Sequence, residues 1–282
     1  MSTKVSFKKD FTIGGDLRVR RMGYGAMRIT GKGIWGPPKD HDEAIRVLRR
    51  AVELGVNFID TADSYGPHIS EELIAEALHP YPAGLVIATK GGLLRTGPDQ
   101  WPVNAHPDHL KEALEGSLAR LNVDRIDLYQ LHRIDPKVPA EKTFEFLQGV
   151  QEEGLVKHIG LSEVSVEDIK KAEEYFEVVS VQNMYSYDNR KWESVLEYCE
   201  ATGKAFIPWY PLNGGNVEAM KKIEKVADKV KATPHQVALS WLLHHSPNIL
   251  LIPGTSSVAH LEENIKAEQI VFAEDMLEEL EG

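Results

Sequence analysis

Eight short apolar runs alternate with amphipathic stretches from Val19 to the end of the chain. The amphipathic stretches, such as HDEAIRVLRRAVELG, PDHLKEALEGSLARLN and PAEKTFEFLQGVQEEG, have the three-and-four spacing of helices that cover a core. Most of the runs are continuously apolar, as strands buried on both faces are. This alternation predicts a parallel sheet of repeated strand–helix units. The runs are RVRRMGYG, VNFID, LVIATK, RIDLYQLH, VKHIGLS, VVSVQN, AFIPWY and NILLIP.

Eight such units without a Pro/Ser-rich linker favour a (β/α)8 TIM barrel over a doubly wound sheet, with residues 1–282 forming a single domain. FTIGGDLRVR predicts an N-terminal β-hairpin around Gly14–Gly15 that plugs the N-terminal end of the barrel. The segment between the last two runs is long enough for two helices divided at Thr233–Pro234. Only a short C-terminal tail with the helical pattern AEDMLEELEG follows the barrel.

The charge and the cysteine content exclude several classes of protein. A net charge of -11 disfavours nucleic-acid and anionic membrane surfaces, so a small-molecule partner is expected. Cys199 is the only cysteine, which excludes an intramolecular disulfide and is typical of a core residue. Neither a signal-peptide core nor an apolar run long enough to span a bilayer occurs, so a cytoplasmic protein is expected. The oligomeric state stays open.

Polar residues stand where the predicted strands end. Because barrel enzymes use the C-terminal ends of their strands, these residues are candidates for chemistry at one shared mouth. They are Asp60 and Tyr65 after the second run, Lys90 after the third, His132 after the fourth, Ser162 after the fifth, and Gln182 and Asn183 after the sixth.

Taken singly, each of these residues has a structural explanation, such as a helix cap, a solvated strand end or core packing. Taken together, an acid, a phenol, an ammonium and an imidazole form a proton-transfer set. A tyrosine phenol titrates near pH ~10 and is a weak acid at neutral pH, but an adjacent ammonium stabilises its phenolate form. Lys90, held by Asp60, is expected to supply that charge to Tyr65.

The chain resembles the aldo-keto reductase family, and specifically its short bacterial type, over nearly its whole length. GVNFIDTADSYG, ATKGG, DLYQLHR, KHIGLSEV, VQNMYS and IPGTSSVAHLEEN carry the resemblance. It implies an NADP-dependent carbonyl reductase whose catalytic tetrad is matched by Asp60, Tyr65, Lys90 and His132. In that family the tyrosine donates the proton and the histidine orients the carbonyl, and no metal is required. Asp63 matches no tetrad position and is expected to shape its loop.

The resemblance also implies where the cofactor lies. Ser162, Glu163 and Gln182 match positions that hold the nicotinamide carboxamide, although many relatives have asparagine in place of Glu163. Trp209 matches the aromatic residue that stacks on the nicotinamide ring. Further expected contacts are Gly25, Ala26 and Met27 below the cofactor, and Tyr210, Pro211, Leu212 and Gly214 along the loop at its pyrophosphate.

The adenosine end decides between NADP and NAD. Many relatives clamp the 2′-phosphate with a lysine and an arginine, where this chain has Gly254 and His260. The hydroxyls of Thr255, Ser256 and Ser257, the amides at the following helix N-terminus and His260 suit an anion, so NADP is favoured and NAD is the less favoured alternative. Simple helix capping explains the hydroxyls equally well. Glu263 and Asn264 match the adenine contacts of the family.

The short tail predicts an open pocket, in which Tyr65 and His132 meet the substrate. Trp35 and Trp101, and with them Tyr24 and Tyr210, are expected to line it and to favour an aromatic or planar carbonyl compound, although local packing also explains the tryptophans. YGPH and NILLIPGTSSVAHLEEN look like stretches of short bacterial members that reduce pyridoxal. Three alternatives remain: an NAD-preferring alcohol dehydrogenase, a catalytically weak NADPH-binding regulatory subunit, and a barrel that binds a phosphorylated metabolite at GTSS.

Overall fold

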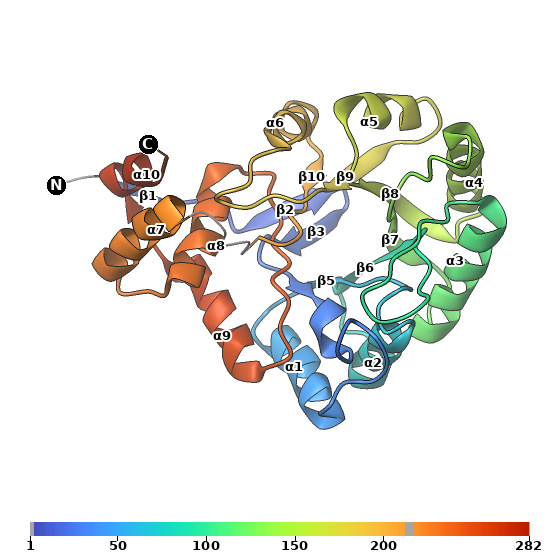
Figure 1. Ribbon diagram of the computed structural model, residues 1–282, viewed down its shortest axis with the longest axis horizontal. Helices are drawn as coiled ribbons and strands as arrows, with labels where there is room; N and C mark the ends of the chain where they lie inside the picture. The colour runs from blue at the N-terminus through green and yellow to red at the C-terminus, as the bar shows by residue number, and fades with distance from the viewer. Residues whose placement is uncertain (1–2, 212–216, 282) are drawn as a thin grey trace.

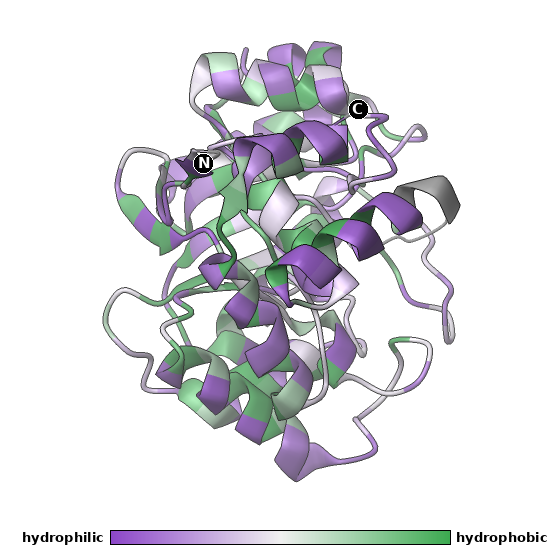
Figure 2. Ribbon diagram, turned by 90° about the vertical axis from the view of Figure 1, so that its left-hand side faces the viewer, coloured by the Kyte–Doolittle hydropathy of each residue, from purple (hydrophilic) through white to green (hydrophobic). Residues whose placement is uncertain are grey.

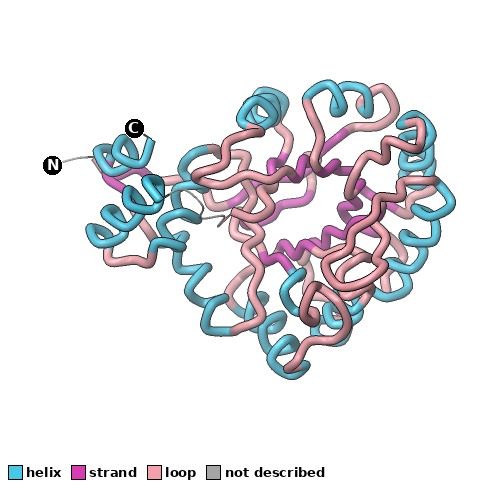
Figure 3. The backbone as a smooth tube through the Cα atoms, viewed as in Figure 1, coloured by secondary structure: helices cyan, strands magenta, loops and turns pink. Residues whose placement is uncertain are grey.

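Seven parallel strands form a curled sheet in the computed structural model, which describes residues 3–211 and 217–281. Each strand pairs in parallel with the next one along the chain. The strands form a ring when viewed end-on (Figure 3). They are β4 (Tyr24–Gly25), β5 (Phe58–Asp60), β6 (Val86–Gly91), β7 (Ile126–Leu131), β8 (Val156–Ser162), β9 (Val178–Gln182) and β10 (Ala205–Phe206).

The eighth predicted strand closes the ring through isolated bridges. Ile249 pairs with Phe206 at the end of β10, and Leu251 pairs with Met22 just before β4. The backbone amide of Leu250 donates to the carbonyl of Phe206 at 2.8 Å, and that of Gly23 donates to the carbonyl of Leu251 at 2.7 Å. The (β/α)8 barrel predicted from the alternation is therefore confirmed, and its last strand is short.

Helices surround the ring (Figure 1). Most of them mix hydrophobic and hydrophilic residues, as amphipathic helices over a core do (Figure 2). The helices are α1 (His41–Glu53), α2 (Ile69–Leu78), α3 (Pro107–Leu121), α4 (Ala140–Glu152), α5 (Val166–Ala172), α6 (Glu193–Thr202), α7 (Val217–Val230), α8 (Pro234–His245), α9 (Val258–Lys266) and α10 (Glu274–Glu281), with 3-10 turns η1 (Ala26–Ile29) and η2 (Ala267–Gln269).

The division between α7 and α8 falls at Thr233–Pro234, as predicted. The hydroxyl of Thr233 accepts from the amide of Gln236, and the side chain of Gln236 accepts from the amide of Thr233. This reciprocal cap satisfies amides that have no partner inside the helix. Pro234 occupies the first helical position, where its missing N–H is no loss.

The predicted N-terminal hairpin is present. Its strands are β2 (Asp10–Ile13) and β3 (Leu17–Arg20), which pair antiparallel around Gly14 and Gly15. Side chains from the hairpin, including Ile13 and Val19, pack into one buried cluster with barrel residues such as Phe58 and Leu128. The hairpin thus closes the barrel as expected.

The first predicted strand, RVRRMGYG, is wrong as a single element. Its first three residues belong to the hairpin strand β3, and only Tyr24 and Gly25 form the barrel strand β4. Between them, Arg21 turns the chain and its buried guanidinium donates to the carbonyls of Ile249 and Leu243. An apolar run cannot show such a break, because both halves are buried.

The two ends of the described chain meet beside α10 (Figure 1). β1 (Lys4–Val5) pairs antiparallel with β11 (Phe272–Ala273). Lys225 and Lys229 on α7 form ion pairs with Glu279 on α10, which holds the short C-terminal helix against the barrel layer. Cys199 is buried in the main core, in agreement with its predicted packing role.

Candidate active site

Asp60, Lys90 and Tyr65 meet at the C-terminal mouth of the barrel. Asp60 ends β5 and Lys90 lies in β6, and both side chains are buried. The ammonium of Lys90 donates to Oδ1 of Asp60 at 2.6 Å and to the carbonyl of Thr61 at 2.7 Å. It lies 3.4 Å from the hydroxyl of Tyr65, within hydrogen-bond distance. Three members of the predicted set therefore form one connected cluster.

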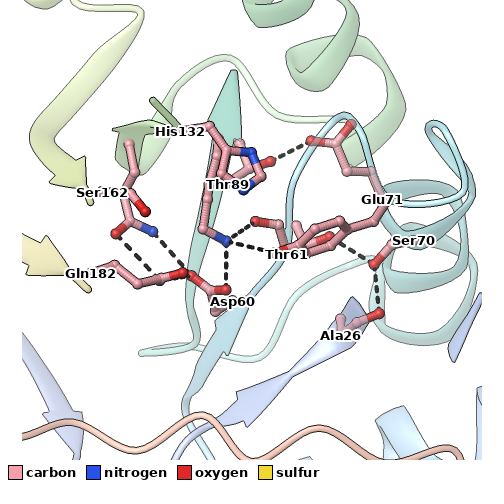
Figure 4. Close-up of polar contacts among 12 residues, drawn as sticks. Ala26, Asp60, Thr61, Ser70, Glu71, Thr89, His132, Ser162 and Gln182 are labelled. Atoms are coloured by element: carbon pink, nitrogen blue, oxygen red, sulfur yellow. Dashed lines mark hydrogen bonds and ion pairs between the residues drawn. The ribbon is translucent and has the colours of Figure 1, made fainter. Parts of the chain in front are cut away.

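Amide side chains satisfy the second oxygen of Asp60. Oδ2 accepts from Nε2 of Gln130 at 3.0 Å. It also accepts from Nε2 of Gln182 at 2.9 Å (Figure 4). Donors on both oxygens hold the carboxylate in one orientation toward Lys90. Sequence reasoning missed Gln130, which sits inside the apolar run of β7 just before His132.

Burial and the neighbouring charges decide the protonation of this cluster. Burial lowers the pKa of Lys90, but Asp60 and Tyr65 together raise it above its usual range, so Lys90 stays charged. Burial raises the pKa of Tyr65, and the charge of Lys90 opposes that effect without outweighing it. The expected lowering of the phenol pKa is therefore only partly right: Lys90 acts in the predicted direction, but desolvation is the larger effect.

His132 follows β7 and completes the cluster. Its ring centroid lies 6.0 Å from that of Tyr65, nearly perpendicular to it. Burial, followed by the charges of Lys90 and Arg133, holds the pKa of His132 well below its usual range. Its buried Nδ1 has no hydrogen-bond partner among the described residues. The imidazole is therefore neutral and can donate a hydrogen bond.

Hydrogen bonds connect the loop that carries Tyr65 to α2 and β6. The hydroxyl of Thr61 shares a hydrogen bond of 2.7 Å with that of Ser70 on α2, and Ser70 donates to the carbonyl of Ala26 (Figure 4). The amide of Asp63 donates to the carbonyl of Lys90 at 3.1 Å. These contacts place Tyr65 relative to β6.

Asp63 contacts the backbone of its own loop, as expected, and its carboxyl group also has a raised pKa. Its carboxylate accepts from the backbone of Ser64, while its Oδ1 is buried without a partner. Burial, and then the negative charge of Glu71, raise the pKa of Asp63 to about 8. The side chain is therefore largely protonated at neutral pH.

Arg95 binds three loops of the mouth together, and sequence reasoning missed it. All five of its N–H groups donate to backbone carbonyls. Nε bonds Gln100, Nη1 bonds Ile34 and Ser64, and Nη2 bonds Gly33 and Gly97. Its guanidinium carbon lies 3.6 Å from the centre of the Trp101 ring and 5.6 Å from that of Trp35. No sequence motif marks such an arginine.

The tryptophans lie at the mouth, but Tyr24 does not. Trp101 packs edge-on against Tyr65, with ring centroids 6.3 Å apart. Trp35 is 37% exposed and bridges to Gly66, one residue after Tyr65. Tyr24 is fully buried in the core and donates to the carbonyl of Thr255 at 2.6 Å, so the expectation that it lines the pocket is wrong.

The residues expected at the carboxamide lie next to the tetrad. Ser162 accepts from Nη1 of Arg133 at 2.9 Å, and Gln182 is the donor to Asp60. Glu163 adopts a left-handed backbone with φ of 55°. Its Oε1 accepts from the indole N–H of Trp209 at 2.7 Å, so the carboxylate already orients the ring expected to stack on the nicotinamide.

The loop after β10 is described only in part. Tyr210 is half exposed and has a positive φ of 61°, and Pro211 is buried. Leu212 and Gly214, expected at the pyrophosphate, lie outside the described residues.

A cavity of about 440 Å³ lies beside three of the residues expected near the adenosine. Gly254, Thr255 and Ser256 line it, and so do Arg28 and Lys32 from the segment after β4. Gly25, Ala26 and Met27 directly precede Arg28, and the first two are buried.

The other residues expected near adenosine lie on α9. His260 is exposed, and Asn264 is partly buried. Glu263 accepts from the hydroxyl of Thr233 at 2.9 Å. This bond joins the expected adenine contact to the start of α8.

The comparisons with known proteins agree with this geometry. A family model described as the aldo/keto reductase family matches residues 21–282. The chain belongs to the aldo-keto reductase family. This aldo-keto reductase is 54% identical to an uncharacterized oxidoreductase of Schizosaccharomyces pombe over 268 residues, which cover 95% of this chain and 87% of that protein. It is 44% identical to pyridoxine 4-dehydrogenase of Escherichia coli over 278 residues, which cover 96% and 97% of the two chains.

Solved aldo-keto reductases share the fold. The structure of a thermostable member in complex with the inhibitor epalrestat has a TM-score of 0.84 and 29% identity, covering 98% of each chain. A member from Klebsiella pneumoniae in complex with NADPH has a TM-score of 0.82 and 25% identity, covering 97% of this chain and 94% of that one.

Within residues 3–211 and 217–281, no helix of this aldo-keto reductase has the length and apolarity to cross a membrane. In the same residues, no group of three or more His, Cys, Asp or Glu side chains is placed to hold a metal ion.

Proposed function

We propose that this chain reduces an aldehyde or ketone to the alcohol with NADPH, with Tyr65 as the proton donor. The observation that carries the proposal is the contact of Lys90 with both Asp60 and the Tyr65 hydroxyl, at 2.6 and 3.4 Å. A buried ammonium beside a phenol stabilises the phenolate left after donation.

Each of the four tetrad residues has its own role in the proposed reaction. When bound, NADPH supplies a hydride to the carbonyl carbon. His132, being neutral, donates a hydrogen bond to the carbonyl oxygen and polarises it. Tyr65 gives its proton to the developing alkoxide, and Lys90 stabilises the resulting phenolate. Asp60 keeps Lys90 charged and in place. The reverse reaction oxidises an alcohol, with the phenolate as the base.

The residues present fit a dinucleotide. Trp209 offers a ring beside the tetrad, held by Glu163. The cavity lined by Thr255 and Ser256 offers hydroxyls, and Arg28 and Lys32 offer positive charge, where a phosphate of the cofactor would lie. Ser162 and Gln182 are the proposed contacts of the nicotinamide carboxamide. The relative solved with NADPH supports the choice of cofactor.

We assign an aromatic, planar carbonyl compound as the substrate class, with pyridoxal as the first candidate. Trp101 stands beside Tyr65 and gives the mouth an apolar wall against which a planar ring can stack. Trp35 extends this wall outward. The pyridoxine 4-dehydrogenase of Escherichia coli, 44% identical, supports pyridoxal by its name.

Loss of NADPH absorbance with a panel of aldehydes tests the proposal. We expect turnover with pyridoxal and benzaldehyde, and slower turnover with small aliphatic aldehydes. Tight NADPH binding without any turnover would favour the regulatory alternative. Binding of neither NADPH nor NADH, measured by tryptophan fluorescence, would favour the phosphorylated-metabolite alternative and overturn the proposal.

A further inference from the structure

The cavity beside Thr255 has a positive lining in an acidic protein. Arg28 and Lys32 are exposed at it, and none of the described residues that line it is acidic. Within the described part of the chain, the side chains of Arg28 and Lys32 make no hydrogen bond or ion pair. The chain as a whole carries a net charge of -11. Two unpaired cations beside two hydroxyls suit a phosphate group.

A side chain at position 254 would collide with the backbone carbonyl of Gly25 and would touch the side chain of Arg28. A Cβ atom added to Gly254 would lie 3.4 Å from Cγ of Arg28 and 2.9 Å from the carbonyl oxygen of Gly25. The end of β4 and the segment before α9 therefore approach too closely for a larger residue at position 254. The positive charge of the cavity lining therefore comes from Arg28 and Lys32, on the side facing Gly254.

The N-terminus of α9 is already occupied. The amide of Val258 donates to Oε1 of Glu43 at 3.0 Å, and the amide of Ser257 donates to the hydroxyl of Thr255 at 3.1 Å. A phosphate at this helix end would meet the carboxylate of Glu43. The helix amides are thus a poor anion site here, in contrast to the expectation from the sequence. An anion is better placed on the side of Arg28 and Lys32.

We propose that Arg28 and Lys32 bind the 2′-phosphate of NADP and set the preference of this chain for NADP over NAD. The proposal rests on the proposed NADPH dependence. In this arrangement the segment after β4 supplies the positive charge. Gly254, which has no side chain, and the hydroxyls of Thr255 and Ser256 allow the phosphate to approach closely. His260, exposed on α9, is not needed for it.

Titration calorimetry with 2′,5′-ADP and 5′-AMP measures how much the 2′-phosphate contributes to binding, independently of any turnover. We expect wild-type protein to bind 2′,5′-ADP at least about tenfold more tightly than 5′-AMP, since a charge-assisted contact contributes about that factor or more. The double variant Arg28→Gln/Lys32→Gln is expected to lose this difference. Its Kd for NADPH should rise about tenfold or more, while its Kd for NADH changes less than about twofold.

Lys39→Gln is the matched control, because Lys39 is an exposed cation of the same segment outside the cavity. It removes a charge from the surface and should leave both affinities unchanged. The inference is overturned if the double variant keeps the wild-type ratio of the Kd values for 5′-AMP and 2′,5′-ADP. It is also overturned if the double variant binds NADPH and NADH more weakly by the same factor, because the two cations would then contact the diphosphate. Wild-type protein that binds no nicotinamide cofactor would instead contradict the proposed function.

Discussion

The ammonium of Lys90 lies 2.6 Å from Oδ1 of Asp60, and both side chains are buried inside the barrel. An isolated charge in such a place is strongly disfavoured, but this pair is satisfied on every side. Lys90 also donates to a backbone carbonyl, and Asp60 accepts from two glutamines. The pair thus delivers a permanent positive charge to the hydroxyl of Tyr65.

Asp60→Asn should destabilise the protein strongly, because it leaves the buried ammonium of Lys90 without its counter-charge. The free energy of unfolding is expected to fall by about 3 kcal/mol or more. Urea denaturation measures it. Asp16→Asn is the control, since the carboxylate of Asp16 is half exposed where it pairs with Lys157 and His158, and it should contribute less than about 1 kcal/mol. Equal losses in the two variants would contradict the account.

Asp63→Asn should change how stability depends on pH. Burial raises the pKa of Asp63 to about 8 in the folded protein, above the ordinary value of 3.8 for an aspartate. The folded state therefore holds this proton when the unfolded state has lost it, and the stabilisation is lost as pH rises toward about 8. Relative to wild type, the asparagine variant should gain stability steadily from about pH 4 to about pH 8. Parallel curves of melting temperature against pH would refute the raised pKa.

Arg95→Lys should loosen the aromatic wall, because lysine cannot supply five donors or a flat face to Trp101. We expect the KM for an aromatic aldehyde to rise about tenfold, and the KM for a small aliphatic aldehyde to change less than about twofold. The Kd for NADPH, measured by fluorescence, should stay unchanged, because the hydrogen bonds that Arg95 makes among the described residues go to the loops of the mouth. An equal rise in KM for both aldehydes would show that Arg95 acts through the general stability of the fold and not through Trp101.

The barrel and its proton-transfer residues were predictable from the sequence for a physical reason. Strands buried on both faces require continuous apolar runs, so Asp60, Lys90 and His132 stood out as polar residues at the ends of such runs. Tyr65 was found by its spacing after Asp60. The structure brings Asp60, Lys90 and Tyr65 into one hydrogen-bonded cluster, with the His132 ring beside them.

The supporting contacts were not predictable, because they depend on distances between segments far apart in the chain. Gln130 is hidden within an apolar run, and Arg95 acts through carbonyls that any sequence would offer. Tyr24 looked like a pocket residue because aromatic rings suit both a pocket and a core. The sequence left the phosphate to hydroxyls, helix-end amides and His260, whereas in the structure Arg28 lies across from Gly254.

Tyr65→Phe tests whether Tyr65 is the proton donor, because it removes the phenolic proton and keeps the ring against Trp101 and His132. Single-turnover reduction of an aromatic aldehyde should slow by at least about a hundredfold, the factor typical of a positioned general acid. NADPH binding, followed by fluorescence, should be unchanged, which separates loss of chemistry from loss of the site. A variant that reduces the aldehyde at nearly the wild-type rate would show that Tyr65 is not the proton donor.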